Sequence, residues 1–179
     1  NVEEFLKKFG FGSRTGVELS GESKGSFTEY NTCKTCLSSL SIGYSINTTQ
    51  YQMVKGYSII ANGGNDIQLS LLRNLDQNVN QKSIISNDLS NRLKKLLINV
   101  VEGDNGTGKS LRMSGYVIGG KTGTSRTYLE GIGYSDKRFN TSFTGFIETN
   151  EGPIVGSVIL WGTRLSDFRV CNRWFYSCT

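Results

Sequence analysis

The sequence contains no histidine, one proline and no apolar run close to the roughly 18 residues of a membrane-spanning helix. Without an imidazole, the chain can form neither a Ser-His-Asp triad nor a histidine-based zinc hydrolase site. Its first residues also lack the charged-then-apolar pattern of a secretory leader. Because the chain begins at Asn1 with no methionine, we expect an excised piece of a longer protein, with no membrane anchor in this piece.

Length and charge predict one basic globular domain. The 179 residues suffice for a single domain with a core, and 36% of them are apolar and 20% charged. The net charge is +5, but Lys and Arg are scattered along the chain. This charge suits either an anionic partner, such as nucleic acid, acidic lipid or cell-wall carboxylate, or a solvated basic surface. We favour the solvated surface and predict no nucleic-acid partner.

Four cysteines occur as two pairs, Cys33-x-x-Cys36 and Cys171-(x6)-Cys178. The second spacing does not match the close pairs of a zinc ribbon, so we predict no metal site. A disulfide in an oxidising compartment and free thiols both remain open.

Two amphipathic helices are predicted in the first hundred residues. The first follows Thr48 as its N-cap and stops at Asn62-Gly63-Gly64. Its apolar face is predicted from spacings of three and four to contain Met53, Val54, Tyr57, Ile60 and Ala61.

The second predicted helix covers residues 86–102. Ser86 or Asn87 serves as its N-cap, Asp88 suits the positive end of the helix dipole, and Gly103 stands at the usual position of a left-handed C-terminal glycine. The apolar stripe of this helix contains Leu89, Leu93, Leu96, Leu97, Val100 and Val101.

From Tyr116 onward the sequence changes to short β-rich segments separated by turn-forming residues. The segments YVIGGKTGTSRT, NTSFTGFIE and PIVGSVILWG predict strands of an antiparallel sheet. Because helices come first and strands follow, the predicted class is α+β, with an antiparallel sheet packed against helices.

The segment GDNGTGKS, residues 103–110, matches the phosphate-binding pattern G-x-x-x-x-G-K-[ST]. A phosphate loop follows a strand and opens a helix, whereas here Gly103 ends a predicted helix and LRMSG follows Ser110. No apolar strand that ends in Asp follows to hold magnesium. We therefore interpret the glycines as a helix-to-strand connection and predict no bound nucleotide.

Residues 119–125, GGKTGTS, predict an edge strand that lines a cleft. Lys121 offers a fixed cation that can hold a carboxylate or depress a neighbour's pKa. Thr122 and Thr124 offer hydroxyl donors on one side, since alternate strand residues face the same way. Gly123 leaves room for a substrate backbone, and the N–H of Thr124 can point at a developing oxyanion.

This segment resembles the third active-site motif of penicillin-binding proteins, the D,D-transpeptidases of peptidoglycan synthesis. FGFGSRTGVELSGESKG is similar to the family's F-G-[FL]-G-x-x-T-G-[IV]-[DE]-L-x-G-E segment, and SLSIGYSINTTQYQMVKGYSIIANGG to its G-Y-G-x-x-x-T-P-L-Q-[LM] helix. VVEGDNGTGKSLRMSGYVIGGKTGTS resembles V-V-x-x-G-T-G-x-x-A-x-x-x-G-Y-x-[VI]-x-G-K-T-G-T, and SFTGFIETNEGPIVGSVIL resembles the following strand pair. The first and last segments favour the monofunctional, class B branch.

The resemblance implies a serine acyltransferase that cross-links stem peptides ending in D-Ala-D-Ala and is trapped by β-lactams, with no cofactor. It implies that Lys121 supports the acid–base network and the substrate carboxylate. Thr122 and Thr124 would bind that carboxylate, Gly123 would lie beneath the substrate, and the Thr124 N–H would share the oxyanion hole. The intact protein would work with division or elongation machinery, held by an upstream membrane helix on the periplasmic or outer face.

The chain departs from the family at several points. No lysine follows a serine at the spacing of the nucleophile motif S-x-x-K. Ser45-Ile46-Asn47 matches the second motif, S-x-N, but lies in the wrong segment, and we interpret the match as a coincidence. Ser45 also replaces a family glycine. After VILWGT the chain lacks the amphipathic closing helix, so an apolar face of the sheet is expected to stay exposed.

We therefore predict residues 1–179 to be the C-terminal portion of a single transpeptidase domain, with 163–179 as an atypical tail. The alternative is a non-catalytic, penicillin-binding-protein-like scaffold or ligand-binding module. An S-x-x-K motif upstream of Asn1 in the gene would distinguish the two.

The chain of residues 1–179, purified alone, should not become covalently labelled by a fluorescent penicillin, because it has no Ser-x-x-Lys nucleophile motif. Denaturing gel electrophoresis after incubation measures the label. A labelled band whose adduct maps to Ser45 would contradict this prediction.

Overall fold

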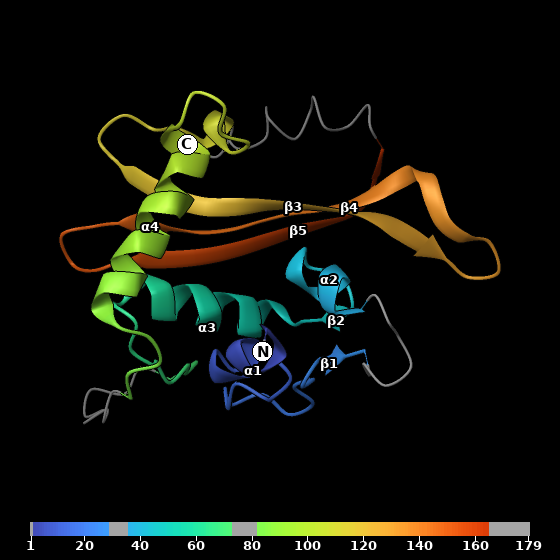
Figure 1. Ribbon diagram of the computed structural model, residues 1–179, viewed down its shortest axis with the longest axis horizontal. Coiled ribbons are helices and arrows are strands. Elements are labelled where there is room, and N and C mark those ends of the chain that lie inside the picture. Colours follow the sequence, from blue (N-terminus) through green and yellow to red (C-terminus); the bar gives the residue numbers. More distant parts are fainter. Residues whose placement is uncertain (1, 29–35, 73–81, 165–179) are drawn as a thin grey trace. The chain divides into compact units, whose positions relative to one another are not determined.

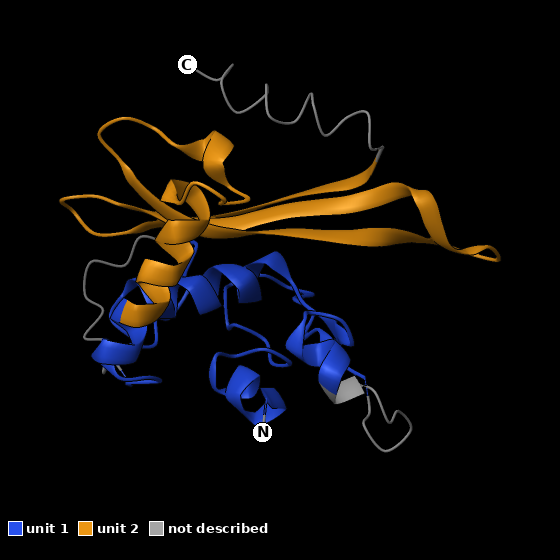
Figure 2. Cartoon of the chain, turned by 45° about the horizontal axis from the view of Figure 1, so that its top comes forward, with its two compact units in different colours: residues 1–91 blue, residues 92–179 orange. Residues whose placement is uncertain are grey.

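A computed structural model of the chain describes residues 2–28, 36–72 and 82–164 (Figure 1). The chain divides into two compact units, residues 1–91 and 92–179, which Figure 2 colours separately. Helices and antiparallel sheets are both present, which confirms the predicted α+β class. None of the described helices has the length and apolar character needed to cross a bilayer.

The first unit is built from short helices and one small sheet. The strands β1 and β2 have two residues each and pair antiparallel, a sheet that was not predicted from the sequence. Helix α4 begins in this unit and continues into the second. The elements are α1 Val2–Lys8, β1 Ser26–Phe27, α2 Cys36–Ser41, β2 Ile46–Asn47, α3 Gln50–Ala61 and α4 Asn87–Glu102.

Helix α3 begins with a capping box. Thr49, not the predicted Thr48, is the N-cap: its hydroxyl accepts from Gln52 N at 3.2 Å, and Gln52 Oε1 accepts from Thr49 N at 3.0 Å. Gln52 is fully buried and also donates to the carbonyls of Ser13 and Lys24. Gln52 thus both completes the capping box of α3 and binds two loop segments that are distant in sequence.

The buried face of α3 differs from the predicted one. Its buried residues are Gln52, Gly56, Ser58, Ile59 and Ala61, so only Ala61 of the predicted face is fully buried. Apolar spacing misidentified the face because three of the buried residues are polar or glycine. Burial raises the pKa of Tyr57 to about 12.

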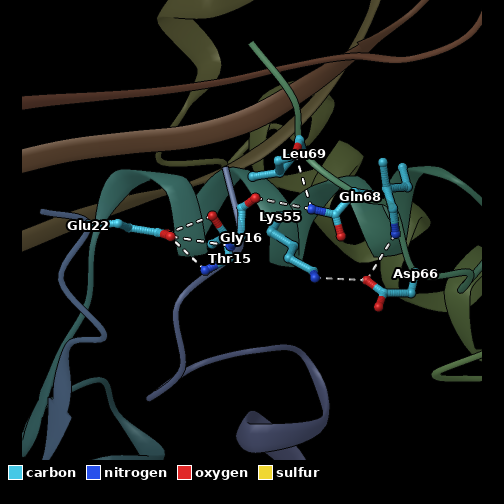
Figure 3. Close-up of polar contacts among 8 residues, drawn as sticks. Thr15, Gly16, Glu22, Lys55, Asp66, Gln68 and Leu69 are labelled. Carbon is cyan, nitrogen blue, oxygen red and sulfur yellow. Dashed lines mark hydrogen bonds and ion pairs between the residues drawn. The ribbon is translucent and has the colours of Figure 1, made fainter. Parts of the chain in front are cut away.

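A carboxylate closes the loop between α1 and β1 (Figure 3). Glu22 is 9% exposed and accepts hydrogen bonds from Thr15 N at 2.8 Å, Thr15 Oγ1 at 2.6 Å and Gly16 N at 3.2 Å. The Thr15 side-chain hydrogen bond, reinforced by the backbone donors, lowers the pKa of Glu22. In the motif T-G-V-E-L-S-G-E, the first two residues, Thr15 and Gly16, therefore donate hydrogen bonds to the last residue, Glu22. These bonds close the loop.

Ser45 has a left-handed backbone conformation, with φ of 62°. It is the one non-glycine residue with positive φ among those described. An L-residue with a Cβ pays roughly 1–2 kcal/mol for this conformation, whereas glycine does not. The resemblance implies glycine at this position, and glycine would adopt the same conformation without that cost.

Helix α4 is capped at both ends by side chains. Ser86 Oγ accepts from Leu89 N, which confirms Ser86 as the N-cap. At the other end, the Arg112 guanidinium donates to the carbonyls of Val101, Glu102 and Gly103 at 2.6–2.9 Å. The carbonyls of Val101 and Glu102 would otherwise lack partners within the helix, whereas that of Gly103 also accepts from Gly106 N at 2.9 Å.

Two predictions for α4 are wrong in detail. Gly103 does not adopt the left-handed conformation, so the arginine replaces the glycine-type C-cap. Leu96, placed in the apolar stripe, is 66% exposed, whereas Val101 of the same stripe is fully buried.

The second unit contains a three-stranded antiparallel sheet in the order β3-β4-β5, which confirms the predicted strands. A short 3₁₀ helix, η2, precedes the sheet. Lys121 pairs in register with Thr144, and Thr144 with Ser157. The bounds are η2 Lys109–Leu111, β3 Val117–Leu129, β4 Gly133–Glu148 and β5 Ile154–Arg164.

The outer part of the β3–β4 hairpin is separated from the inner part by irregularities in register. The pairing shifts between Arg126 and Tyr128 on β3 and, against β5, between Phe139 and Thr141 on β4. The Asn140 side-chain oxygen accepts from Thr127 Oγ1 at 3.0 Å and Gly162 N at 3.1 Å, which ties the three strands together there. Beyond this point the hairpin carries a T-shaped pair of tyrosines, Tyr128 and Tyr134.

Helix α4 packs on one face of this sheet. Phe146 is 1% exposed, and Lys94 of α4 lies over its ring at 5.9 Å while pairing with Glu148. Gly119, in register with Phe146, leaves space for that ring: a Cβ at Gly119 would lie 2.5 Å from it. The ring thus fills the space under β3.

The opposite face carries an apolar cavity of about 280 Å³ beneath residues 110–113. Ile154 and Val158, which line it, are 63% and 45% exposed. The expected exposed apolar face is therefore present in the described part of the sheet. Residues 165–179 of the predicted atypical tail, with Cys171 and Cys178, lie outside the described residues, as does Cys33.

The Glu22 loop predicts a pH-dependent contribution to stability. Because the folded-state pKa of Glu22 is lowered, its contribution is present above the unfolded pKa near 4.5 and is lost as pH falls through the folded value. Glu22→Gln should lower the free energy of unfolding by about 1–2 kcal/mol at pH 7. Urea unfolding at pH 7 and pH 3 measures this, and the difference from wild type should shrink at pH 3.

The matched control is Glu130→Gln, since Glu130 is an exposed carboxylate. Its substitution should leave stability within about 0.5 kcal/mol of wild type at both pH values. A Glu22→Gln difference that is the same at both pH values would contradict the assignment.

Candidate functional site

Strand β3 carries the Lys-Thr-Gly-Thr segment at the margin of the sheet. In the described sheet, β3 pairs with β4 alone, so its other edge has no strand partner. Lys121 is exposed on this strand, rather than inside the core or on a helix. The prediction that residues 119–125 form an edge strand is thereby confirmed.

The ammonium group of Lys121 lies against the next residue of its own strand. Lys121 Nζ donates to the Thr122 carbonyl at 2.9 Å and approaches Thr122 Oγ1 at 3.4 Å. Its cross-strand neighbour, Thr144, is buried and its hydroxyl pairs with that of Ser157 at 2.9 Å. The backbone of Lys121 therefore belongs to a packed, hydrogen-bonded part of the sheet, while its ammonium group is accessible to solvent.

The hydroxyl of Thr122 meets a second threonine from outside the sheet. Thr107 Oγ1 and Thr122 Oγ1 lie 2.9 Å apart, a hydrogen bond across 15 positions of sequence. Thr107 belongs to the G-D-N-G-T-G segment, which the sequence analysis interpreted as a connection only. The G-T-G match to the family pattern was the available signal for this residue.

Gly123 and Thr124 complete the predicted segment. A Cβ at Gly123 would lie 2.5 Å from Ser142 Oγ, so the serine hydroxyl occupies the space that a side chain would need. Thr124 is exposed and pairs in register with Thr141. Lys121, Thr122, Gly123 and Thr124 therefore lie consecutively on one edge strand, and their roles in binding and catalysis remain predictions.

A cavity of about 400 Å³, with a mixed polar and apolar lining, borders Lys121. Its other walls come from the end of α4 and the following loop, namely Asn99, Val100, Gly103, Asp104, Asn105, Gly106 and Thr107. The residues that spell a phosphate-loop pattern thus form one wall of the space beside the lysine. This juxtaposition brings the two motifs of the sequence together.

The backbone around residues 103–110 has an order different from that of a phosphate loop. It follows helix α4 and leads into the three-residue turn η2, whereas a phosphate loop follows a strand and opens a full helix. Lys109 Nζ donates to the Asp104 carbonyl at 2.7 Å. The lysine of the pattern is therefore engaged by the loop itself.

Ser45, Ile46 and Asn47 lie in the first unit and make local structural contacts. The Ser45 carbonyl accepts from Thr28 N at 3.0 Å, and Asn47 Nδ2 donates to Ser26 Oγ at 3.1 Å. These bonds join β2 to β1.

Comparisons with known proteins agree with the motifs. Residues 1–173 match the family described as "Penicillin binding protein transpeptidase domain". The chain is 30% identical over 160 residues to the probable peptidoglycan D,D-transpeptidase PbpC of Pseudomonas aeruginosa, with 89% of this chain covered. It is 30% identical over 182 residues to penicillin-binding protein PbpB of Mycobacterium tuberculosis, with 92% of this chain covered.

A solved structure shows the same fold. The transpeptidase domain of penicillin-binding protein 3 from Burkholderia pseudomallei superposes with a TM-score of 0.78 at 22% identity, over 89% of this chain and 48% of that one. The chain spans 28% of the length of PbpC and 27% of that of PbpB. The relatives therefore contain large regions that have no counterpart in these 179 residues.

The Arg112 cap is predicted to stabilise the C-terminal end of α4, which lines the cavity beside Lys121. Arg112→Ala removes three charge-assisted hydrogen bonds to the last carbonyls of α4 and should lower the free energy of unfolding by about 1–2 kcal/mol. Arg112→Lys keeps the charge without the planar fork and should recover only part of the loss. Thermal unfolding measures both variants, and equal stability of Arg112→Ala and wild type would contradict the capping role.

Proposed function

Because the chain belongs to the family of penicillin-binding protein transpeptidase domains, we propose that the intact protein is a peptidoglycan D,D-transpeptidase. In this proposal the chain supplies the edge strand that receives the substrate, as the C-terminal portion of the domain. The serine nucleophile belongs to an S-x-x-K motif outside these 179 residues, which contain none. The observation that carries the proposal is the Lys121-Thr122-Gly123-Thr124 segment on the margin of the sheet, with Lys121 and Thr124 exposed.

The margin suits an extended peptide as its ligand. A strand with a free edge can add a peptide as a further strand through backbone hydrogen bonds, while side chains near the edge select the ligand. The substrate proposed here is a stem peptide that ends in D-Ala-D-Ala. β-Lactams would bind in the same place because they carry a carboxylate and a reactive carbonyl.

The charge of the segment matches the terminal carboxylate of such a peptide. The exposed Lys121 ammonium would attract it, and the hydroxyls of Thr122 and Thr124 would donate hydrogen bonds to it. In the acylation step, the serine oxygen gives up its proton and forms a bond to the carbonyl carbon of the penultimate D-Ala. The peptide C–N bond breaks, and the terminal D-Ala leaves as an amine whose nitrogen has taken up a proton. The Thr124 N–H would stabilise the oxyanion of the tetrahedral intermediate. The amine of a second stem peptide then displaces the serine.

The cellular setting follows from the same proposal. Stem peptides are assembled into peptidoglycan outside the cytoplasmic membrane, so the domain would act on the periplasmic or outer face. An upstream membrane helix would hold it there beside division or elongation machinery. These features concern the intact protein.

The intact protein should be covalently labelled by a fluorescent penicillin, and Lys121→Ala should lower the second-order rate constant of labelling at least about a hundredfold. This loss follows because the ammonium acts on both the carboxylate and the acid–base network. Stopped labelling reactions, resolved on denaturing gels, give the rate constant.

Lys95→Ala is the matched control, because Lys95 is an exposed lysine of α4. It should label at the wild-type rate. An intact protein that contains a complete S-x-x-K motif but does not label would overturn the proposal and favour the non-catalytic scaffold.

A further inference from the structure

We propose that Thr107 is a positioning residue that orients the Thr122 hydroxyl towards the substrate carboxylate. This inference rests on the proposed function, because it concerns how the same edge strand binds its ligand. It assigns a role to the loop of residues 103–108, whose pattern resembles a phosphate loop. The role depends on the 2.9 Å hydrogen bond between the two threonine hydroxyls.

The hydroxyl of Thr122 can form only a small number of hydrogen bonds. A threonine hydroxyl has one proton to donate and two lone pairs with which to accept. Lys121 Nζ, which can only donate, already approaches this oxygen at 3.4 Å. If Thr107 also donates to it, both lone pairs are occupied and the single proton of Thr122 is left for another acceptor.

A carboxylate at the sheet margin is the acceptor that this arrangement favours. A hydroxyl whose oxygen accepts from an ammonium and a second hydroxyl is polarised, which strengthens its own donation. Hydrogen bonds to an ionised oxygen are also the stronger ones. Thr107 thereby converts a freely rotating hydroxyl into a donor with a preset direction, which lowers the entropy that binding must remove.

The loop is held in place well enough to perform this task. Gly108 N donates to the Val100 carbonyl at 2.9 Å, and Lys109 Nζ closes the loop on Asp104. At Gly106 any side chain would collide with the Val100 carbonyl, so glycine is required by close approach to the helix. Thr107 lies between these two glycines and is therefore positioned by the last turn of α4.

The loop also passes close to Phe143, the neighbour of Thr122 on the sheet. Phe143 pairs in register with Thr122, and a Cβ at Gly108 would lie 3.6 Å from the Phe143 ring. Consecutive loop residues thus lie over a cross-strand pair, Thr107 over Thr122 and Gly108 over Phe143. The loop therefore follows the strand over two neighbouring positions, and the hydrogen bond between Thr107 and Thr122 joins the two.

The test uses the intact protein and a pair of β-lactams that differ only in the carboxylate. Thr107→Val removes the hydroxyl and keeps the shape of the side chain. It should slow acylation by benzylpenicillin about three- to tenfold, the effect of one hydrogen bond. It should leave acylation by the methyl ester of benzylpenicillin unchanged, because the ester has no ionised acceptor. Thr107→Ser, which keeps the hydroxyl, should react with both compounds at the wild-type rate.

A double-substitution cycle checks that Thr107 acts through Thr122. Adding Thr107→Val to Thr122→Val should cause no further loss with benzylpenicillin, because the hydroxyl to be oriented is already gone. Thr107→Ala serves as the second hydroxyl-free variant if Thr107→Val does not fold. Mass spectrometry of the acyl-enzyme gives the rates for both compounds.

The outcomes separate this inference from the function on which it rests. Wild-type protein that is not acylated by benzylpenicillin would overturn the proposed function and this inference with it. Acylated wild type with an unaffected Thr107→Val variant would overturn the inference alone. Equal losses with the acid and the ester would also overturn it, because they would show general distortion of the site.

Discussion

The backbone hydrogen bonds between β3 and β4 hold the segment Lys121–Thr124 in an extended conformation, while the other edge of β3 has no strand partner in the described sheet. A strand edge of this kind normally invites aggregation and is blunted by charge. Lys121 supplies that charge here. In the proposed function, the residue that discourages pairing with a second protein strand would also attract a ligand with a negative terminus.

The edge strand β3 is packed on both faces of the sheet. On one face Phe146 fills the space left by Gly119 and carries Lys94 of α4 above its ring. On the other, Thr107 of the loop after α4 hydrogen-bonds to Thr122, and Gly108 of the same loop lies close to Phe143. Arg112 fixes the end of α4 from which that loop departs. The helix, the loop and the strand therefore form one connected framework within the second unit.

Much of this arrangement could be predicted from the sequence because the strongest signals were local. The β-rich segments separated by turn formers gave the three strands, and Ser86 gave the start of α4. The N-cap of α3 was misplaced by one residue, although Thr49 and Gln52 have the spacing of a capping box. Its buried face was missed because Gln52 is buried for its hydrogen bonds, which hydrophobic spacing does not detect.

The parts of the site that depend on long-range contacts could not be read from the sequence. Thr107 and Thr122 are 15 positions apart, and nothing in either segment alone indicates that their hydroxyls meet. The arginine cap of α4 depends likewise on a turn that returns Arg112 to the helix end. The edge strand was found because glycines and a lysine are unusual in a β-rich segment, whereas the orientation of Thr122 requires coordinates.

The register irregularities around Asn140 have a consequence for how related proteins can diverge. Because the pairing is reset at that point, residues added to or removed from the tip of the hairpin need not slide Lys121 past Thr144. A change in the length of the hairpin tip therefore leaves the register of Lys121–Thr124 unchanged. Lineages can remodel the protruding tip, with its tyrosine pair, while inheriting an unaltered alignment of the strand that bears the lysine.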